Sequence, residues 1–591
     1  MILTRRQFVQ LAGGSAAALG VGLLLAACGG AAAPAASSSA APASAAPASS
    51  AVASAAASVS ASPAPASGSA PASASGAVKV AGVTLPSYAA PNVPPPDLPG
   101  NTQGLVPAYF SFPKNLVKTV SQTPGSGGDV NVLHFTLYPP PAPTASNSAW
   151  QLLNKNLGVN FKMDILGAAD YGAKLGSVIA GGSLPDIINI PPGATVPNFP
   201  QFLKADCQDL TAFLSGDAIK DYPNLAGYPT DAWKNVVYNG GIYGVPLPLD
   251  LTGDAVFVRQ DWMSQAGVSM PTSGAEFKRV LQALTKPAQN HWGFAVVPSG
   301  GTNNGETGFG FFPQIFGAPN NWAVDSSGKF TKDIESDEYK QSLAYEADLW
   351  KAGVFEPSST NYNQTQADGD FIGGKYAMHA ILWVLYPFFT DRIGAGKVSY
   401  LPPFSANGGK PAYYLSRGYF SFVVLKKASS DRIKELLSIL NYLGAPFGSQ
   451  ESLMTRYGVE GKDFAFDPQG NPQLTPQGQK DLPGNGAWSN LIQQPPVLYS
   501  NTHTKEYGQT MYNAEKQDLA VGIPDPTVGL FSNTQSNKGQ LLAQLVGGKQ
   551  TDIIFGRAPL SDWDQLLKDW RAQGGEQVRS EYQLAYAASK S

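Results

Sequence analysis

The segment DVNVLHFTLY, residues 129–138, has the pattern that decides the fold. Its apolar residues recur as they do in a buried strand, at Val130, Val132, Leu133, Phe135 and Leu137. The next segment, NSAWQLLNKNLG (147–158), predicts a helix, because a capping residue, Asn147 or Ser148, precedes it and Gly158 ends it. A strand followed by a helix therefore opens the folded part of the chain.

The same order repeats in the following residues. We expect a strand in VNFKMDIL (159–166), a helix in DYGAKLGSVIAGG (170–182) and a short apolar strand in PDIINI (185–190). Strands that alternate with helices form parallel sheets with helical crossovers. The sequence thus predicts an α/β fold.

Later segments extend this pattern into a second lobe. GIYGVPLPLD (241–250) predicts a strand that leaves the first lobe, and AVFVRQDWMSQAG (255–267) predicts a further strand and helix, with Arg259 and Asp261 in structural roles and Asp261 as the helix N-cap. We also expect helices at 337–353 and 430–444, a strand at 419–425, and two C-terminal helices broken at Gly574-Gly575. About 460 residues follow residue 128, which is too many for one core and suits two lobes.

The N-terminus has the features of an export signal. Arg5 and Arg6 precede an apolar stretch from about Ala16 to Ala27, and this stretch is shorter than the roughly 20 residues that span a bilayer. Residues 4–8 (TRRQF) resemble a twin-arginine signal, and residues 25–28 (LAAC) resemble a bacterial lipobox. We expect residues 1–27 to be a signal peptide and Cys28 to be lipidated, which anchors the protein on the outer side of the cell membrane. An ordinary signal peptide with a chance cysteine is the alternative.

A low-complexity segment follows Cys28. From Ala31 to Gly76 every residue except Val52 and Val59 is Ala, Ser, Pro or Gly, a composition that cannot bury enough apolar surface to fold. We predict a disordered linker over 28–128, with the proline-rich part at 91–113 lying loosely on the globular domain, and a folded domain over 129–591.

The bulk composition limits the partners. Lys and Arg number 40 against 43 Asp and Glu, with no basic block, which argues against nucleic acid. Charged residues make up only 14% of the chain, while Trp numbers 10 and Tyr 24, so a neutral polar ligand such as a sugar suits this protein. Once Cys28 is lipidated, Cys207 has no disulfide partner in the chain, and we expect it to be a buried small apolar residue.

Six motifs occur along the chain in a specific order. They are IAGGSLPDIINI (179–190), YGVPLP (243–248), VFVRQDWMSQAGVSMPTSGAEF (256–277), GKYAMHAILW (374–383), PFGSQESLMTRYGVEGKDF (446–464) and IIFGRAPLSDWDQLLKDWRAQGGEQVRSEYQLAY (553–586). Together they resemble the extracellular solute-binding lipoproteins (family 1) of carbohydrate ABC importers, in the branch of large lipoproteins that serves complex oligosaccharides. The resemblance covers nearly all of residues 129–591.

This resemblance implies a two-lobed, periplasmic-binding-protein-like fold of type II. Each lobe has a mixed sheet flanked by helices, crossing strands join the lobes, and the ligand lies in the cleft between them. The first lobe would comprise about 129–250 and 419–500, and the second about 251–418 and 501–591. The chain would cross near residues 247–251, near Tyr419 and between Tyr499 and Tyr512.

Six residues are candidates for ligand binding, because sugars need flat aromatic surfaces with polar groups beside them. Trp383 is the first, since GKYAMHAILW resembles the family segment that delivers a stacking tryptophan, although Ile381-Leu382 stand where the family has Gly and Pro; Tyr386 follows in the same loop. Trp322 lies in a turn-rich stretch, and core packing is the alternative for both tryptophans. The polar and strand-end candidates are Asp250, Arg417 and Tyr138. A solvated or helix-capping role is the alternative for Asp250.

Enzyme signatures are weaker. The four histidines are isolated, and GGSLP around Ser183 lacks the second glycine of a nucleophile elbow. GDFIGGKY (369–376) has the spacing of a phosphate loop until Tyr376 replaces the required Ser or Thr. Asp250, Asp254, Asp368 and Asp370 supply carboxylates for a glycosidase, but no spacing selects a pair. We therefore expect a non-enzyme without cofactor or bound metal.

The favoured hypothesis is a monomeric, lipid-anchored binding protein of an ABC importer. It would capture an oligosaccharide, or another small polar solute, by hinge closure and pass it to a membrane permease. The alternatives are a lipid-anchored glycoside hydrolase or lyase and a polysaccharide-binding adhesin. Fold alone does not decide among them.

Overall fold

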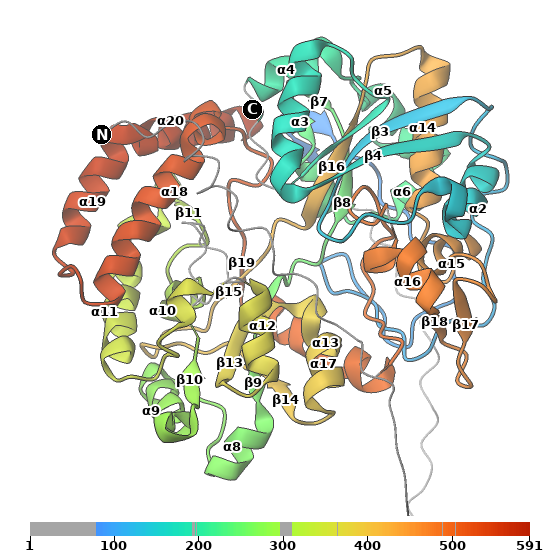
Figure 1. Ribbon diagram of the computed structural model, residues 1–591. Coiled ribbons are helices and arrows are strands. Elements are labelled where there is room, and N and C mark those ends of the chain that lie inside the picture. Colours follow the sequence, from blue (N-terminus) through green and yellow to red (C-terminus); the bar gives the residue numbers. More distant parts are fainter. Residues whose placement is uncertain are drawn as a thin grey trace, which may run out of the picture. The chain divides into compact units, whose positions relative to one another are not determined.

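The apolar run at residue 129 forms β3 (Asp129–Thr136), which is buried along most of its length. A strand covered on both faces is typical of a parallel sheet, and β3 pairs in parallel with β4 (Asn160–Gly167) and β5 (Ile187–Ile190). The computed structural model shown in Figure 1 describes residues 78–191, 196, 198–295, 310–362, 364–486, 488–502 and 504–590. The predicted signal peptide, Cys28 and the linker up to residue 77 lie outside these ranges.

The first sheet has five strands in the order β4-β3-β5-β16-β8. β16 (Tyr419–Leu425) runs antiparallel to both β5 and β8 (Val245–Pro248). Its helices are α2 (Ser148–Leu157), α3 (Ala168–Gly181), α4 (Phe199–Asp206), α5 (Thr211–Leu214), α6 (Pro223–Ala226), α7 (Thr230–Lys234), α14 (Ser430–Leu443), α15 (Gln450–Tyr457) and α16 (Pro476–Asp481). Two small hairpins, β6–β7 (237–242) and β17–β18 (464–474), complete this first lobe.

The second sheet has four strands in the order β10-β13-β9-β14. Their bounds are β9 (Asp254–Arg259), β10 (Trp292–Phe294), β13 (Tyr376–Leu382) and β14 (Val398–Tyr400). The second lobe contains α8 (Gln260–Ala266), α9 (Gly274–Leu284), α10 (Phe311–Phe316), α11 (Asp337–Lys351), α12 (Gln364–Ile372), α13 (Tyr386–Ile393), α17 (Thr504–Ala520), α18 (Asn533–Ile554), α19 (Asp562–Trp570) and α20 (Glu576–Lys590). Shorter pairs are β11–β12 (322–332) and β15–β19, which joins residues 413–414 to 522–523.

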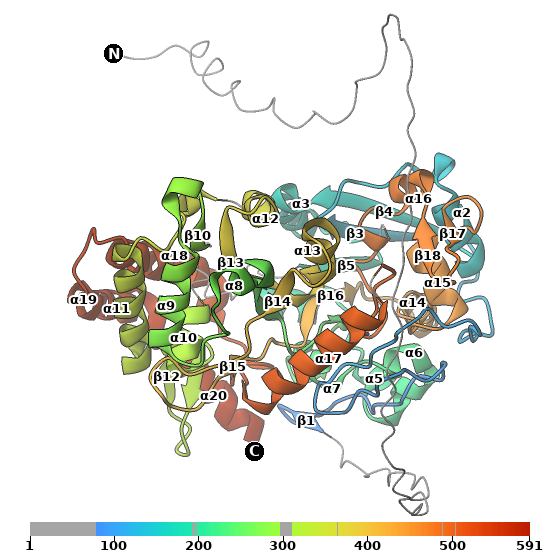
Figure 2. The ribbon, with the colours of Figure 1, turned by 90° about the horizontal axis from the view of Figure 1, so that it is seen from below.

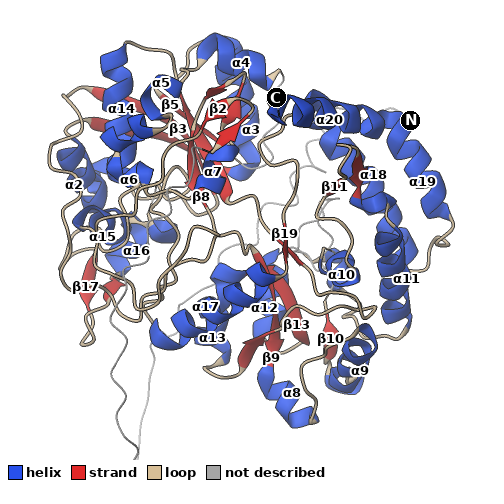
Figure 3. Ribbon diagram, turned by 180° about the vertical axis from the view of Figure 1, so that it is seen from behind, coloured by secondary structure: helices blue, strands red, loops and turns tan. Residues whose placement is uncertain are grey.

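Both faces of the second sheet are covered, and the alternation within β9 shows why. Val256 and Val258 point into the core beneath α9, α10 and α11, whereas Ala255 and Phe257 point into a second core with α13 and α17. Residues two apart share a face of a strand. Figure 2 shows α17 along its length, and Figure 3 shows helices around both sheets. The predicted α/β fold, with helix-flanked sheets in two lobes, is confirmed.

Several predicted helix ends are confirmed. The Asn147 side chain accepts a hydrogen bond from the Trp150 amide, and Gly158 ends α2 in the left-handed conformation with φ 69°. The break at the C-terminal glycines is also present, with Gly574 at φ 143° between α19 and α20. The expectation that Asp261 caps α8 is wrong, because Arg259 occupies the N-cap. The Asp261 carboxylate instead binds the Arg259 guanidinium through two hydrogen bonds of 2.9 and 2.6 Å.

Residues 78–128 are part of the fold, which corrects the prediction that the linker runs to residue 128. Val83 and Leu85, in and next to the hairpin β1–β2 (79–84), are buried in the core of the first lobe. Val106 and Ala108 are buried in the core with α17. This segment makes its contacts with residues far along the chain, such as the 3.0 Å bond from the Tyr109 amide to the Leu498 carbonyl. The proline-rich composition of this segment did not predict that these few apolar side chains are buried.

No helix within the described ranges is both long enough and apolar enough to cross a membrane.

Candidate ligand-binding site

The strand directions place several chain segments at one edge of the first sheet. β3, β4, β5 and β8 all end at this edge, and the antiparallel β16 begins there, because Phe422 pairs with Ile190 and Tyr419 with Pro248. Open α/β sheets bind their ligands at the carboxyl ends of their strands. Tyr138, Asp250 and Arg417, three of the six predicted ligand-binding residues, follow or precede these strand ends.

An edge of the second sheet lies close to this one. β8 ends at Pro248 and β9 begins at Asp254, and the short connection spans at most roughly 20 Å even when fully extended. β13 ends beside the start of β9, with Leu382 paired to Asp254. We call residues 136–138, 167–170, 190–191, 249–255, 294–295, 382–385, 401–403 and 416–420 the edge segments.

Tyr138 has an aromatic face that is open to solvent. Its side chain is 45% exposed, and its amide donates a 3.0 Å hydrogen bond to the Thr136 hydroxyl. The ring lies against the backbone of Gly484, where a Cβ atom would come within 2.1 Å of the ring. The glycine therefore permits a close contact that supports one side of the ring.

Arg417 is tied to a buried acid. Its guanidinium, about half exposed, lies 3.1 Å from the carboxylate of Asp525, which is almost fully buried. Asp525 also accepts hydrogen bonds from the Asn321 amide group and from Thr527. The Arg417 charge is therefore balanced in place by a fixed counterion.

Asp250, which is partly buried, belongs to a cluster of carboxyl groups between the β8–β9 connection, β14 and α17. Burial raises the pKa of Asp250 to about 7 and that of Asp518 to about 7. Burial, and next the charge of Asp250, raises the pKa of Glu515 well above its usual range. The Tyr400 hydroxyl donates a 2.7 Å bond to Asp518, and the Val106 amide donates a 3.2 Å bond to Glu515. These acids hold protons at a pH where surface acids do not.

Trp383 and Tyr386 lie in the core instead of offering a free ring face, which corrects our expectation. Trp383 is 2% exposed, with Phe257 at a ring-centroid distance of 5.6 Å and Tyr400 at 4.7 Å. β13 continues through Ile381-Leu382 without the Gly-Pro break of the family motif, so Trp383 stays on the same covered face as Ile381. Tyr386 packs against Phe257 and Tyr507 in the same core.

Trp322 is also a core residue, which is the alternative role that we considered for it. It lies in β11, contacts Phe330, Trp570 and Tyr582, and is nearly fully buried. The Arg579 and Lys332 side chains lie over its ring at 5.9 and 5.7 Å. This site anchors the C-terminal helices to the second lobe.

The remaining polar motifs are structural. His379 is buried and bonds through Nε2 to Asp368 at 2.8 Å, and burial lowers its pKa. In GDFIGGKY the helix α12 precedes the glycines and the strand β13 follows them, the reverse of a phosphate loop. Cys207 is buried, which raises the pKa of its thiol to about 12. Within the described ranges no group of three or more His, Cys, Asp or Glu residues is placed to hold a metal ion.

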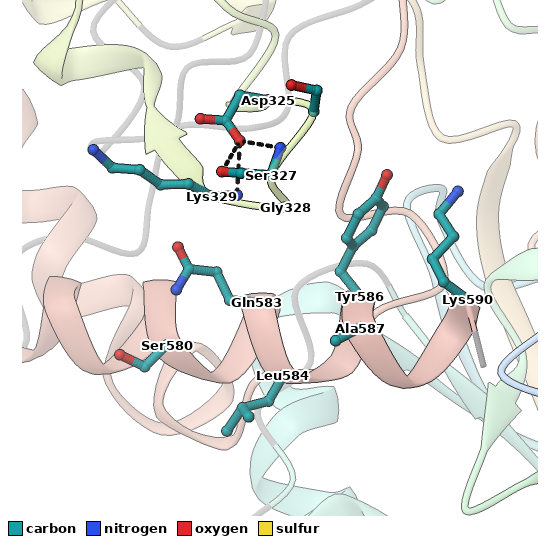
Figure 4. Close-up of a pocket in the computed structure, with 11 residues that line it drawn as sticks. Asp325, Ser327, Gly328, Lys329, Ser580, Gln583, Leu584, Tyr586, Ala587 and Lys590 are labelled. Atoms are coloured by element: carbon teal, nitrogen blue, oxygen red, sulfur yellow. Dashed lines mark hydrogen bonds between the residues drawn. The ribbon is translucent and has the colours of Figure 1, made fainter.

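A groove lies away from the edge segments. Figure 4 shows this groove of about 830 Å³ between the β11–β12 turn and α20. Asp325 stabilises the turn by accepting bonds from the Ser327 amide and hydroxyl and from the Lys329 amide. Tyr586 and Lys590 line the other wall, where the ammonium group lies 5.0 Å from the ring centroid.

Sequence reasoning missed Gly484 and Asp525, which support Tyr138 and Arg417. Gly484 stands in the turn-forming segment LPGNG, but only the fold shows that the turn meets Tyr138. No local pattern links residues so far apart along the chain.

Comparison with known families identifies the class of protein. Residues 139–446, more than half of the chain, match the model of the bacterial extracellular solute-binding proteins. The chain belongs to this family, which confirms the resemblance read from its motifs.

The particular relatives are lipoproteins and sugar-binding proteins. Lipoprotein LipO of Bacillus subtilis is 22% identical over 489 residues, covering 80% of this chain and 95% of the relative. The polygalacturonan/rhamnogalacturonan-binding protein YtcQ of the same organism is 24% identical over 468 residues, covering 76% and 89%. Among solved structures, an HMO-binding, ABC-transporter-associated solute-binding protein of Bifidobacterium longum infantis has the same fold, with a TM-score of 0.60, 17% identity and coverage of 78% and 99%.

Proposed function

We propose that this protein is the extracellular, lipid-anchored binding protein of an ABC importer. It captures an oligosaccharide between the edge segments of its two sheets, closes by hinge motion and delivers the sugar to a membrane permease. It acts as a monomer and catalyses no reaction. The observation that carries this proposal is the open ring of Tyr138 at the carboxyl edge of the first sheet, in a family of extracellular binding proteins.

An open ring supports sugar binding because pyranose rings present apolar faces edged with hydroxyl groups. Tyr138 supplies a flat surface that Gly484 already holds in place, so little conformational entropy is lost when a sugar stacks on it. Arg417 and Asp250 stand at the same edge and supply polar groups. The names of YtcQ and of the Bifidobacterium protein show that relatives in this fold bind sugars.

Short connections between the sheets support hinge motion. The chain passes from Pro248 to Asp254 and returns into β16 at Tyr419, and a few residues in such connections can absorb a lobe rotation. Gly418 in the second connection has φ 71°, a conformation that glycine adopts without strain. We retain the predicted lobe boundaries near residues 250, 418 and 500.

The membrane anchor rests on the sequence. The lipobox at residues 25–28 and the Ala/Ser/Pro-rich segment after it form an anchor and a tether, and the relative LipO is named a lipoprotein. A tether keeps the binding domain within reach of a permease in the same membrane.

A binding assay with the full chain in detergent micelles tests the function. We expect oligosaccharides of the right class to raise the melting temperature without producing new reducing ends. Turnover of the sugar would instead favour the glycosidase alternative and refute the proposal.

The Tyr138→Ala variant tests the site. Loss of one stacking surface should weaken sugar binding by about 1–2 kcal/mol, or roughly five- to thirtyfold. The melting temperature should change little, because the ring is half exposed. Tyr88→Ala is the matched control, since Tyr88 is 48% exposed on the N-terminal segment. Equal affinities for the Tyr138 variant and the control would exclude Tyr138 from the site.

A further inference from the structure

The edge segments contain more acidic than basic residues. These segments contain one cationic residue, Arg417, and three acids, Asp170, Asp250 and Asp254. A sugar that carries carboxylates needs compensating cations at its binding site, and Arg is the residue that pairs best with carboxylates. The excess of acidic residues in the edge segments therefore disfavours the binding of an acidic sugar.

The single cation is already neutralised. Arg417 lies 3.1 Å from the buried carboxylate of Asp525. Asp525 is held in turn by Asn321 and Thr527, so it cannot move away from Arg417 without losing those bonds. A ligand carboxylate would have to compete with an intramolecular partner that loses no further freedom on binding.

A lysine of the first lobe on a helix that begins at the edge is also paired. Lys174 lies on α3, which begins at the edge, but its ammonium group bonds to Asp164 of β4 at 2.9 Å. Asp170, in the first turn of the same helix, is exposed and nearer to the edge. A helix N-terminus favours anion binding when it carries no acid. The N-terminus of α3 carries Asp170 and therefore disfavours an anion.

Further acids lie beneath the edges. Glu515 and Asp518 of α17 are buried near Asp250, and their neighbours from other elements are Val106, Thr252 and Tyr400. Because burial raises the pKa of Asp250 and Asp518 to about 7, these groups ionise as the pH rises through 7, and above that pH their charges oppose a bound anion.

We propose that the ligand is a neutral oligosaccharide and that the edge segments exclude uronic-acid oligosaccharides. This inference rests on the proposed function and narrows its substrate class. It separates this chain from its relative YtcQ, whose name states that it binds polygalacturonan and rhamnogalacturonan. The open Tyr138 ring and hydroxyl-bonding groups suit uncharged rings, while the acid excess acts against charged ones.

A matched pair of ligands tests the inference with the full chain. One arm uses galacturonan oligomers of two to five residues; the other uses the same oligomers with their carboxyl groups reduced, together with neutral gluco-, galacto-, manno-, xylo- and fructo-oligosaccharides. Binding is followed by calorimetry at 20 and 300 mM salt. We expect at least one neutral oligosaccharide to bind, with an affinity that salt leaves unchanged, and galacturonan oligomers to bind at least tenfold more weakly.

The outcomes separate this inference from the proposed function. Galacturonan binding that is tighter than neutral binding and weakens with salt overturns the inference and leaves the proposed function standing. Absence of binding in both arms overturns both.

Two variants test the physical cause. Asp525→Asn frees the Arg417 charge and Asp170→Asn removes an exposed acid, and each should tighten galacturonan binding at least threefold at 20 mM salt. Asp564→Asn is the control, because Asp564 on α19 is an exposed acid that pairs with Lys340 of α11, away from the edge segments. If neither test variant differs from this control, charge does not set the ligand class and the inference fails.

Discussion

Replacing the buried carboxylate of Asp518 by an amide should stabilise the protein at high pH. Asp518 is fully buried, and burial raises its pKa from 3.8 to about 7. In the unfolded chain the group ionises near pH 4, so the folded state loses stability relative to it as the pH rises from 4 to 7. At about 1.4 kcal/mol for each tenfold change in proton affinity, this loss approaches roughly 4 kcal/mol above pH 7.

Asp518→Asn keeps an oxygen that can accept the Tyr400 bond and removes the charge. The new amide N–H groups need partners, and one left unpaired costs about 1–3 kcal/mol. We therefore expect a net gain of about 1–3 kcal/mol at pH 8 and no gain at pH 4.5, where native Asp518 is protonated. The assay is thermal and chemical unfolding of the native and variant chains at pH 4.5, 6 and 8.

Asp467→Asn is the control for this experiment. Asp467 is only partly buried, and hydrogen bonds, first from the Asn471 amide, lower its pKa. Its stabilising effect is complete above the usual pKa of an aspartate and is lost only as the pH falls through the lowered value, so the effect of Asp467→Asn should not change between pH 4.5 and 8. A stability difference for Asp518→Asn that is equally independent of pH would refute the reasoning.

Three further substitutions test the roles assigned to particular residues. Trp322→Ala should lower the free energy of unfolding by about 3–5 kcal/mol, as expected for a buried aromatic residue, and leave the sugar affinity unchanged. A loss of sugar affinity without a loss of stability would mean that Trp322 binds the ligand. Gly484→Ala should lower sugar affinity as Tyr138→Ala does, because the added Cβ would meet the Tyr138 ring at 2.1 Å and the residue has φ 64°, a conformation that costs a non-glycine residue about 1–2 kcal/mol. Leu85→Ala should cost about 2–5 kcal/mol, since Leu85 is buried in the first core; an unchanged stability would mean that this segment is a loose linker after all.

The regular part of the fold could be predicted from the sequence because its signals are local. The apolar alternation of β3 and the cap at Asn147 each lie within about ten residues, and the structure has both where we expected them. The strand-helix alternation was enough to predict parallel pairing of β3, β4 and β5.

The site was harder because its residues depend on contacts between distant segments. Nothing near Tyr138 in sequence shows that Gly484 will support its ring, and nothing near Arg417 shows that Asp525 will bind it. For Trp383 the local signal was present, since Ile381-Leu382 replace Gly-Pro, and the straight strand carries the ring into the core. Residues 78–128 were misjudged because a few buried side chains outweigh a composition that otherwise predicts disorder.

The strand order of the first sheet determines when that sheet can be completed during synthesis of the chain. β16 lies between β5 and β8, yet it is synthesised only after all four strands of the second sheet. The first sheet is thus begun first and finished last, and until β16 arrives β5 and β8 each expose an unpaired edge to other chains. Any defect that slows folding of the second lobe prolongs this exposed state, so errors in one lobe should appear as aggregation through the other.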